Sequence, residues 1–196
     1  MRQAIMTKPG HIELREVEKP KALAPNEVLL KIQKIGVCGS DIHVFHGEHP
    51  ATPYPVVQGH EYSATVEAVG HAVTKAKPGM KATARPQLIC GQCGPCKRGQ
   101  YNACQHLKVQ GFQAPGVAQD YFVVPEDRLI IFPDSLSFEQ GAMIEPTAVG
   151  AHATKRANEL KGKNVVVTGA GTIGNLVAQF AKARGAKKVL ITDISD

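Results

Sequence analysis

The chain has 196 residues, of which 43% are hydrophobic and 20% are charged, as in an ordinary globular protein. It has no apolar run of about 18 residues, and Met1–Met6 do not begin the apolar stretch of a signal peptide, so we expect neither a membrane span nor secretion. The formal net charge of +6 comes from scattered lysines rather than a basic run, so no nucleic-acid partner is expected.

Short β-strands are predicted through the first 135 residues or so. Alternating or β-branched segments, separated by Pro and Gly, recur at 2–6, 11–17, 27–37, 63–70, 80–85, 120–124 and 128–132. Ser40 is expected to cap a short helical turn after Cys38. Many short strands of this kind indicate an irregular barrel or sandwich.

After Pro133 the pattern changes, which makes the fold class mixed α/β. Helices are expected after Ser137 and near 146–157. The continuous apolar run Val165–Val167 predicts a fully buried strand, and a glycine-rich turn, a helix and a second strand over 187–192 follow it. We expect the domain boundary near 140–160 and divide the chain into 1–150 and 151–196.

Four of the five cysteines predict a structural metal site. Their spacing, Cys90-x2-Cys93-x2-Cys96-x7-Cys104, lets four thiolates close a tetrahedron around Zn²⁺ at about 2.3 Å per bond, with no position left for substrate. An iron–sulfur cluster is the main alternative, but the bacterial ferredoxin run ends with a shorter gap and a Pro, whereas Gln105 follows here. An odd cysteine count argues against a disulfide framework and favours the reducing cytoplasm.

The fifth cysteine, Cys38, belongs to a second possible metal set. It comes after a predicted strand, and Gly59-His60-Glu61 and Glu145-Pro146 follow later in the chain. Each piece alone is unspecific, since a lone Cys is more often a small buried hydrophobe. Together they supply the Cys, His and carboxylate ligands that suit a catalytic zinc with one open position.

In this combination the chain resembles the medium-chain zinc-dependent alcohol dehydrogenase family, most of all its sorbitol and polyol dehydrogenase branch. The resemblance covers essentially the whole chain. The family motif Gly-His-Glu-x2-Gly-x5-Gly is present as 59–70, with Ala64 in place of a Gly, and 79–82 departs from the family's Gly-Asp-x-Val turn. It implies a GroES-like zinc-binding catalytic domain over 1–150 and the first βαβ unit of a Rossmann NAD-binding domain over 151–196. Because two parallel strands are too few for such a domain, we expect an incomplete piece of a longer protein.

The resemblance also implies the ligands of the catalytic zinc. Cys38 and His60 match two family ligands. The third is either Glu61, as in the Cys, His, Glu and water arrangement of the polyol branch, or Glu145, at a position used by other branches and often Cys there. A carboxylate at 145 favours the polyol branch.

Three further residues match functional positions of the family. Ser40 and His43 fit a proton relay from the bound alcohol through the cofactor ribose to solvent, although Ser40 alone would suit a helix cap and His43 the surface. Phe112 matches an aromatic wall of the polyol pocket.

The segment Gly169-Ala170-Gly171-Thr172-Ile173-Gly174 follows a predicted strand and opens a predicted helix, the context of a dinucleotide-binding turn. Its glycines allow the tight turn, the approach of the pyrophosphate and close helix–strand packing, and the helix N-terminus favours phosphate charge. Asp193, 19 residues after Gly174, is expected to accept hydrogen bonds from the adenosine ribose and so to favour NAD over NADP. Alternatively, Asp193 caps a following helix.

The expected function is oxidation of a secondary alcohol or sorbitol-like polyol to a ketone by a cytoplasmic zinc- and NAD-dependent oxidoreductase with two zinc ions per chain. We expect a small-molecule substrate and a homodimer or homotetramer for the full-length protein. The alternatives are threonine 3-dehydrogenase, a general secondary alcohol dehydrogenase and, from another class, a non-catalytic zinc-binding module. The last applies especially to the 196-residue piece, which we expect to bind zinc whether or not it turns over substrate.

Overall fold

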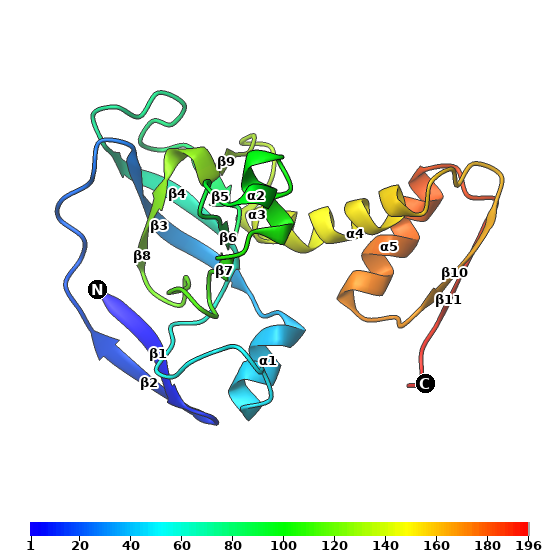
Figure 1. The fold of residues 1–196 in the computed structure, drawn as a ribbon, viewed down its shortest axis with the longest axis horizontal. Coiled ribbons are helices and arrows are strands. Elements are labelled where there is room, and N and C mark those ends of the chain that lie inside the picture. Colours follow the sequence, from blue (N-terminus) through cyan, green and yellow to red (C-terminus); the bar gives the residue numbers. More distant parts are fainter. Residues whose placement is uncertain (196) are drawn as a thin grey trace. The chain divides into compact units, whose positions relative to one another are not determined.

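The computed structural model describes residues 1–195, which form two compact units, Met1–Ala142 and a second that begins at Met143. Figure 1 shows the elements of both units. The division lies between Ala142 and Met143, eight residues before the predicted boundary at 150, and the domain assignment stays a prediction. Within residues 1–195, no helix combines the length and apolar character needed to cross a membrane.

A five-stranded antiparallel sheet forms the centre of the first unit. Its strand order is β8-β3-β4-β5-β9, with bounds β3 Glu27–Gly36, β4 Glu61–Val69, β5 Lys81–Ala84, β8 Tyr121–Pro125 and β9 Leu129–Ile131. Two register shifts interrupt the pairing of β3 with β4, as expected of a bent, irregular sheet. Apolar side chains including Val28, Leu30, Val66 and Val124 fill the core on one side of it. The predicted mixed α/β class with an irregular β-unit is confirmed.

Smaller elements surround this sheet. They are the hairpin β1 (Arg2–Lys8) and β2 (His11–Glu16), the helices α1 (Gly39–His46) and α3 (Phe138–Ala142), and the 3-10 turn η2 (Glu126–Arg128). The prediction that Ser40 caps α1 is wrong: the cap is Cys38, whose backbone N–H donates to the Asp41 carboxylate at 3.0 Å, and Ser40 lies inside the first turn.

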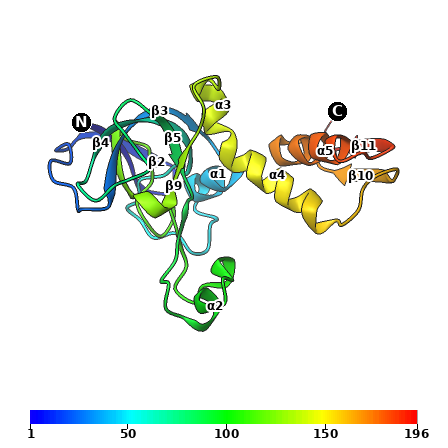
Figure 2. The same ribbon diagram turned by 90° about the horizontal axis from the view of Figure 1, so that it is seen from above.

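A lobe extends from the first unit between two very short strands, β6 (Gln87–Leu88) and β7 (Lys108–Val109). It contains the one-turn helix α2 (Gly94–Lys97) and the 3-10 turn η1 (Tyr101–Ala103). Figure 2 shows α2 well away from the sheet. The sequence did not predict these elements, because two-residue strands are too short to show an alternating pattern.

The second unit contains α4 (Ile144–Arg156), β10 (Asn164–Thr168), α5 (Thr172–Ala183) and β11 (Lys188–Thr192). β10 and β11 pair in parallel across α5, as predicted. The prediction of a fully buried first strand is wrong for Val166, which is 64% exposed, whereas Val167 is 8% exposed. The reason is that the described residues cover one face of this two-stranded sheet only, and Leu190 on β11 is likewise exposed.

Candidate metal centres and dinucleotide turn

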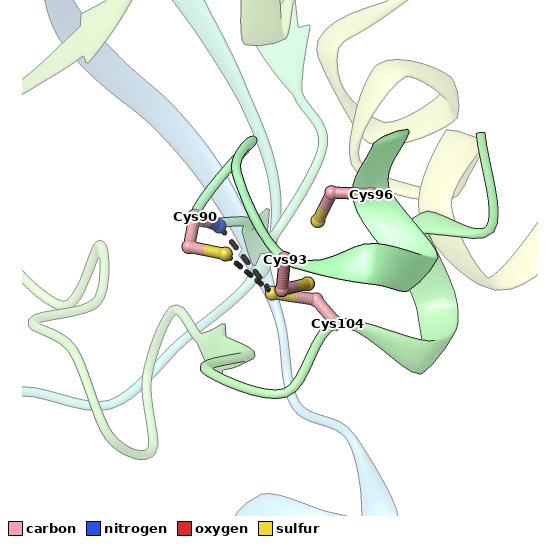
Figure 3. Close-up of side chains that lie close together, drawn as sticks. All are labelled: Cys90, Cys93, Cys96 and Cys104. Atoms are coloured by element: carbon pink, nitrogen blue, oxygen red, sulfur yellow. Dashed lines mark hydrogen bonds between the residues drawn. The ribbon is translucent and has the colours of Figure 1, made fainter. Parts of the chain in front are cut away.

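The lobe brings its four cysteine side chains together (Figure 3). Cys90 follows β6, Cys93 caps α2, Cys96 lies inside α2, and Cys104 ends η1. Their four sulfur atoms all lie within 4.8 Å of one another, and those of Cys90 and Cys104 are 3.6 Å apart. Four thiolates around one zinc would be about 3.8 Å apart, given bonds of about 2.3 Å. The donor set and its spacing therefore fit a closed four-sulfur zinc site.

Backbone N–H groups prepare this cluster for negative charge. Cys104 Sγ accepts hydrogen bonds from the N–H of Cys90 at 3.3 Å and of His106 at 3.4 Å, and these bonds lower the pKa of its thiol. A similar bond from Gln105 lowers the pKa of Cys93 to about 6. Burial raises the pKa of Cys96 to about 12. Four thiolates in so small a volume repel one another, so a bound cation would be needed to keep them all ionised.

Cys38, His60 and Glu61 form a second cluster of possible metal ligands in the first unit. Because β3 and β4 are antiparallel, the end of β3 lies beside the start of β4, and Gly36 pairs with Glu61. One ligand atom from each side chain lies within 4.8 Å of the others. A Cβ on Gly36 would lie 2.5 Å from Glu61 Oε2, so only glycine leaves room for this carboxylate.

The surroundings of this second cluster are buried and charged. His60 is 6% and Glu61 is 7% exposed. Burial raises the pKa of Glu61, while the charge of His60 opposes that rise. Burial also raises the pKa of Asp41, whose Oδ1 lies 3.7 Å from His60 Nδ1. A thiol, an imidazole and a carboxylate converging in a buried place are a donor set that fits zinc with one position left for substrate.

The remaining residues predicted near the catalytic metal lie in different surroundings. Ser40 is half-buried in the first turn of α1, and His43 is exposed with Nδ1 2.9 Å from Glu48 Oε2. Phe112 is buried, and its ring centroid lies 5.0 Å from that of His60. Glu145 lies in the first turn of α4, in the second unit, and its role as a ligand stays a prediction.

Two residues near this cluster have no place in the sequence predictions: Asp41, which lies beside His60, and His49, which contacts Phe112. An acidic residue three positions after a helix cap is a recognisable sequence signal, and Asp41 has this position relative to Cys38. His49 lies beside Phe112. Its ring centroid lies 4.8 Å from that of Phe112, and its Nδ1 lies 2.7 Å from Thr52 Oγ1. No local motif in the sequence marks His49.

The glycine-rich segment forms a tight turn between β10 and α5. Gly169 has a φ of +95°, and a Cβ on Gly174 would lie 1.7 Å from the Gly169 carbonyl oxygen, so both positions require glycine. Gly171 is the cap of α5, and Thr172 and Ile173 begin the helix. The helix N-terminus that could face a phosphate is thus present.

Asp193 follows β11 and is tied to this turn by its side chain. Its Oδ2 accepts a hydrogen bond from the Ala170 N–H at 2.6 Å, and its Oδ1 accepts from the N–H groups of Ile194 at 2.8 Å and Ser195 at 3.1 Å. These bonds lower the pKa of the carboxyl, the first of them most. The carboxylate therefore stabilises the backbone locally and remains exposed. Its recognition of a ribose stays a prediction.

The first unit combines a bent antiparallel sheet, a four-cysteine lobe and a Cys-His-carboxylate set. The second unit contains a βαβ unit with a glycine-rich turn. Together these features are the architecture of a zinc-binding dehydrogenase. Residues 24–134 match the alcohol dehydrogenase GroES-like domain family. The chain belongs to the medium-chain zinc-dependent alcohol dehydrogenase family, as the sequence resemblance predicted.

Individual relatives agree with this family. The chain is 37% identical over 190 residues to L-threonine 3-dehydrogenase of Mesorhizobium japonicum, covering 95% of this chain and 54% of that protein. It is 37% identical over 179 residues to a protein of Aspergillus clavatus named as a probable D-xylulose reductase A, covering 89% of this chain and 50% of the relative. The chain thus spans about half the length of the curated relatives it matches.

Solved structures give the same result. Galactitol-1-phosphate dehydrogenase from Escherichia coli superposes with a TM-score of 0.92 at 36% identity, over all of this chain and 56% of that one. A protein from Sinorhizobium meliloti described as a zinc-binding dehydrogenase and bound to NADP gives a TM-score of 0.90 at 33% identity, over 97% of this chain and 55% of the other.

Proposed function

We propose that the full-length protein oxidises a secondary alcohol or a polyol to a ketone and transfers the hydride to NAD. The observation that carries the proposal is the convergence of the half-buried Cys38 with the buried His60 and Glu61. Similarity to D-xylulose reductase and galactitol-1-phosphate dehydrogenase supports a polyol substrate. We further propose that the enzyme acts in the cytoplasm as a homodimer or homotetramer.

In this proposal Cys38, His60 and Glu61 hold the catalytic zinc, with Glu145 as the alternative third ligand. When bound, zinc would act as a Lewis acid that lowers the pKa of the substrate hydroxyl, and NAD would accept the hydride. The Ser40 hydroxyl accepts the alcohol proton and passes it toward His43. The exposed position of His43, 2.9 Å from Glu48, suits release of that proton to water. Phe112 supplies an apolar wall beside His60.

The second unit would bind the dinucleotide. Gly171 lets the backbone approach the pyrophosphate, and the N-terminus of α5 favours its charge. A carboxylate at Asp193 would repel the 2′-phosphate of NADP, which supports NAD. Because one similar structure holds NADP, the two cofactors are to be compared directly.

Two measurements on the full-length protein test this function. The first is reduction of NAD and of NADP with sorbitol, xylitol, galactitol, 2,3-butanediol and threonine. Turnover of a polyol with NAD is expected, and turnover with none of these substrates would contradict the proposal. The second is metal analysis, where two zinc ions per chain are expected and one would favour a non-catalytic zinc-binding module. Cys38→Ser is expected to abolish turnover and to leave one zinc in the lobe.

Threonine 3-dehydrogenase is the second candidate. It is favoured by the 37% identity to the Mesorhizobium japonicum enzyme over 95% of this chain. Threonine oxidised with a higher kcat/KM than every polyol in the same panel would select it.

A further inference from the structure

A cavity of about 810 Å³ opens in the first unit between the sheet and the base of the cysteine lobe. A volume of this size suits a small organic molecule. None of the eight candidate metal ligands, Glu145 included, lines it. Apolar side chains form much of the wall, among them Leu88, Ile89, Pro115, Phe122, Val123 and Pro125.

Two guanidinium groups, those of Arg85 and Arg128, also line this cavity. Arg85 Nη2 donates to the carbonyl oxygen of Asp127 at 2.6 Å. Arg128 donates to the Arg85 carbonyl oxygen from Nε at 2.9 Å and from Nη2 at 2.6 Å. Arg128 Nη2 also donates to Gln110 Oε1 at 2.9 Å. All of these acceptors are neutral, so they orient the two cations without neutralising them.

The buried amide of Gln110 fixes this arrangement. The side chain of Gln110 is completely buried. The side chain of Tyr62, whose hydroxyl lies next to Gln110, is completely buried too. Because Gln110 Oε1 receives the Arg128 bond, the amide cannot rotate without breaking it. The half-buried Arg128 guanidinium is therefore held at the cavity wall by a rigid neighbour.

The two arginines have unused donors and no paired anion. In the part of the chain that the structure describes, no carboxylate oxygen lies within 4.0 Å of either guanidinium. Asp127 is the acidic residue among those that line the cavity, and its side chain is exposed. Arg85 is exposed, but Arg128 is partly buried. A partly buried cation without an anionic partner is unfavourable unless a ligand supplies the charge.

We propose that this cavity binds a small organic carboxylate with an apolar chain. The carboxylate pairs with Arg85 and Arg128, whose planar guanidiniums suit carboxylate oxygens. The apolar chain packs against the wall that contains Leu88 and Phe122. The site is separate from the proposed alcohol oxidation and does not depend on it.

Isothermal titration of the zinc-loaded full-length protein with hexanoate tests this site. One saturable site is expected. Arg85→Gln is expected to weaken binding by about tenfold or more, because a charge-assisted pair is lost. Its guanidinium makes a single hydrogen bond within residues 1–195, so the substitution should leave the fold and the alcohol dehydrogenase activity unchanged. Arg156→Gln, on the exposed part of α4, is the matched control and should bind hexanoate as the unaltered protein does.

Three comparisons make the test decisive. Hexanol, which lacks the charge, and inorganic phosphate, which lacks the chain, should bind much more weakly than hexanoate. Cys38→Ser, which removes the catalytic zinc, should retain hexanoate binding, and loss of binding there would place the carboxylate on that metal and overturn the proposal. Equal binding to Arg85→Gln and to the unaltered protein, or no saturable binding, would also overturn it.

Discussion

Asp41 and His60 place a buried carboxylate beside a buried imidazole. Asp41 Oδ1 is 3.7 Å from His60 Nδ1, and the side chains are 8% exposed each. The other Asp41 oxygen accepts the Cys38 N–H at 3.0 Å. One carboxylate thus contacts two of the three proposed ligands of the catalytic zinc. Carboxylates in this position orient a ligating imidazole and increase its basicity.

Asp41→Asn should therefore weaken zinc binding at the second cluster by about 10–100-fold, because the amide keeps the shape and removes the charge. Zinc competition with a chelator, followed by metal analysis, measures this affinity. The lobe zinc should be unaffected. Asp134→Asn, at an exposed carboxylate of the same unit, serves as the control. Equal zinc affinity in Asp41→Asn and Asp134→Asn would refute a positioning role for Asp41.

Cys104→Ser should remove the lobe zinc and destabilise the lobe. Cys104 Sγ accepts two backbone N–H groups and lies 3.6 Å from Cys90 Sγ, so a weaker oxygen ligand there disturbs the whole cluster. Because a structural zinc contributes directly to folding, the thermal midpoint should fall. The zinc count is expected to drop from two to one per chain. Faster hydrogen exchange confined to the segment from Cys90 to Val109 would locate the effect, and an unchanged zinc count would contradict it.

The sequence predicted the features that depend on local pattern. The spacing of Cys90, Cys93, Cys96 and Cys104 predicted a cluster that the fold assembles, since all four lie in one short loop. The parallel pair β10 and β11 was also predictable from local pattern. A strand, a glycine-rich turn and an amphipathic helix follow one another directly in the sequence.

Features that depend on long-range pairing could not be predicted from the residues themselves. Cys38 and His60 meet because β3 and β4 are paired. The residue types alone suggested a possible ligand set, and the family resemblance was needed to assign these two as ligands. The cavity arginines, Arg85 and Arg128, are 43 positions apart and share no motif. The exposure of Val166 depends on which elements cover a sheet face, which a run of valines does not specify.

Lys34→Met should raise the pKa of Glu139. Lys34 Nζ lies 2.8 Å from Glu139 Oε1 and joins β3 to α3, and this bond is the main reason that the pKa of Glu139 is lowered to about 2. A lowered carboxyl pKa stabilises the folded state above the unfolded value of about 4.3, and the contribution is lost as the pH falls from there to about 2. Carboxyl NMR titration should show the Glu139 midpoint moving upward in the variant.

The control for this change is Lys21→Met, which breaks the exposed pair of Lys21 with Glu18. It should leave the Glu139 titration unchanged. A Glu139 midpoint equally low with and without Lys34 would show that the helix start alone holds the carboxylate ionised.

The glycine turn allows folding and cofactor binding to be separated by two alanine substitutions. In Gly174→Ala the new Cβ would lie 1.7 Å from the Gly169 carbonyl oxygen, so the second unit should lose about 3 kcal/mol or more of stability. In Gly171→Ala the Cβ meets nothing within 4 Å and φ is −66°, so stability should change by about 1 kcal/mol at most.

If Gly171 lets the backbone approach a pyrophosphate, the alanine methyl of Gly171→Ala should still weaken NAD binding by about tenfold, because the methyl occupies that approach. Thermal unfolding and NAD titration of both full-length variants check this pair. Unchanged NAD affinity in a well-folded Gly171→Ala protein would remove the pyrophosphate from this turn.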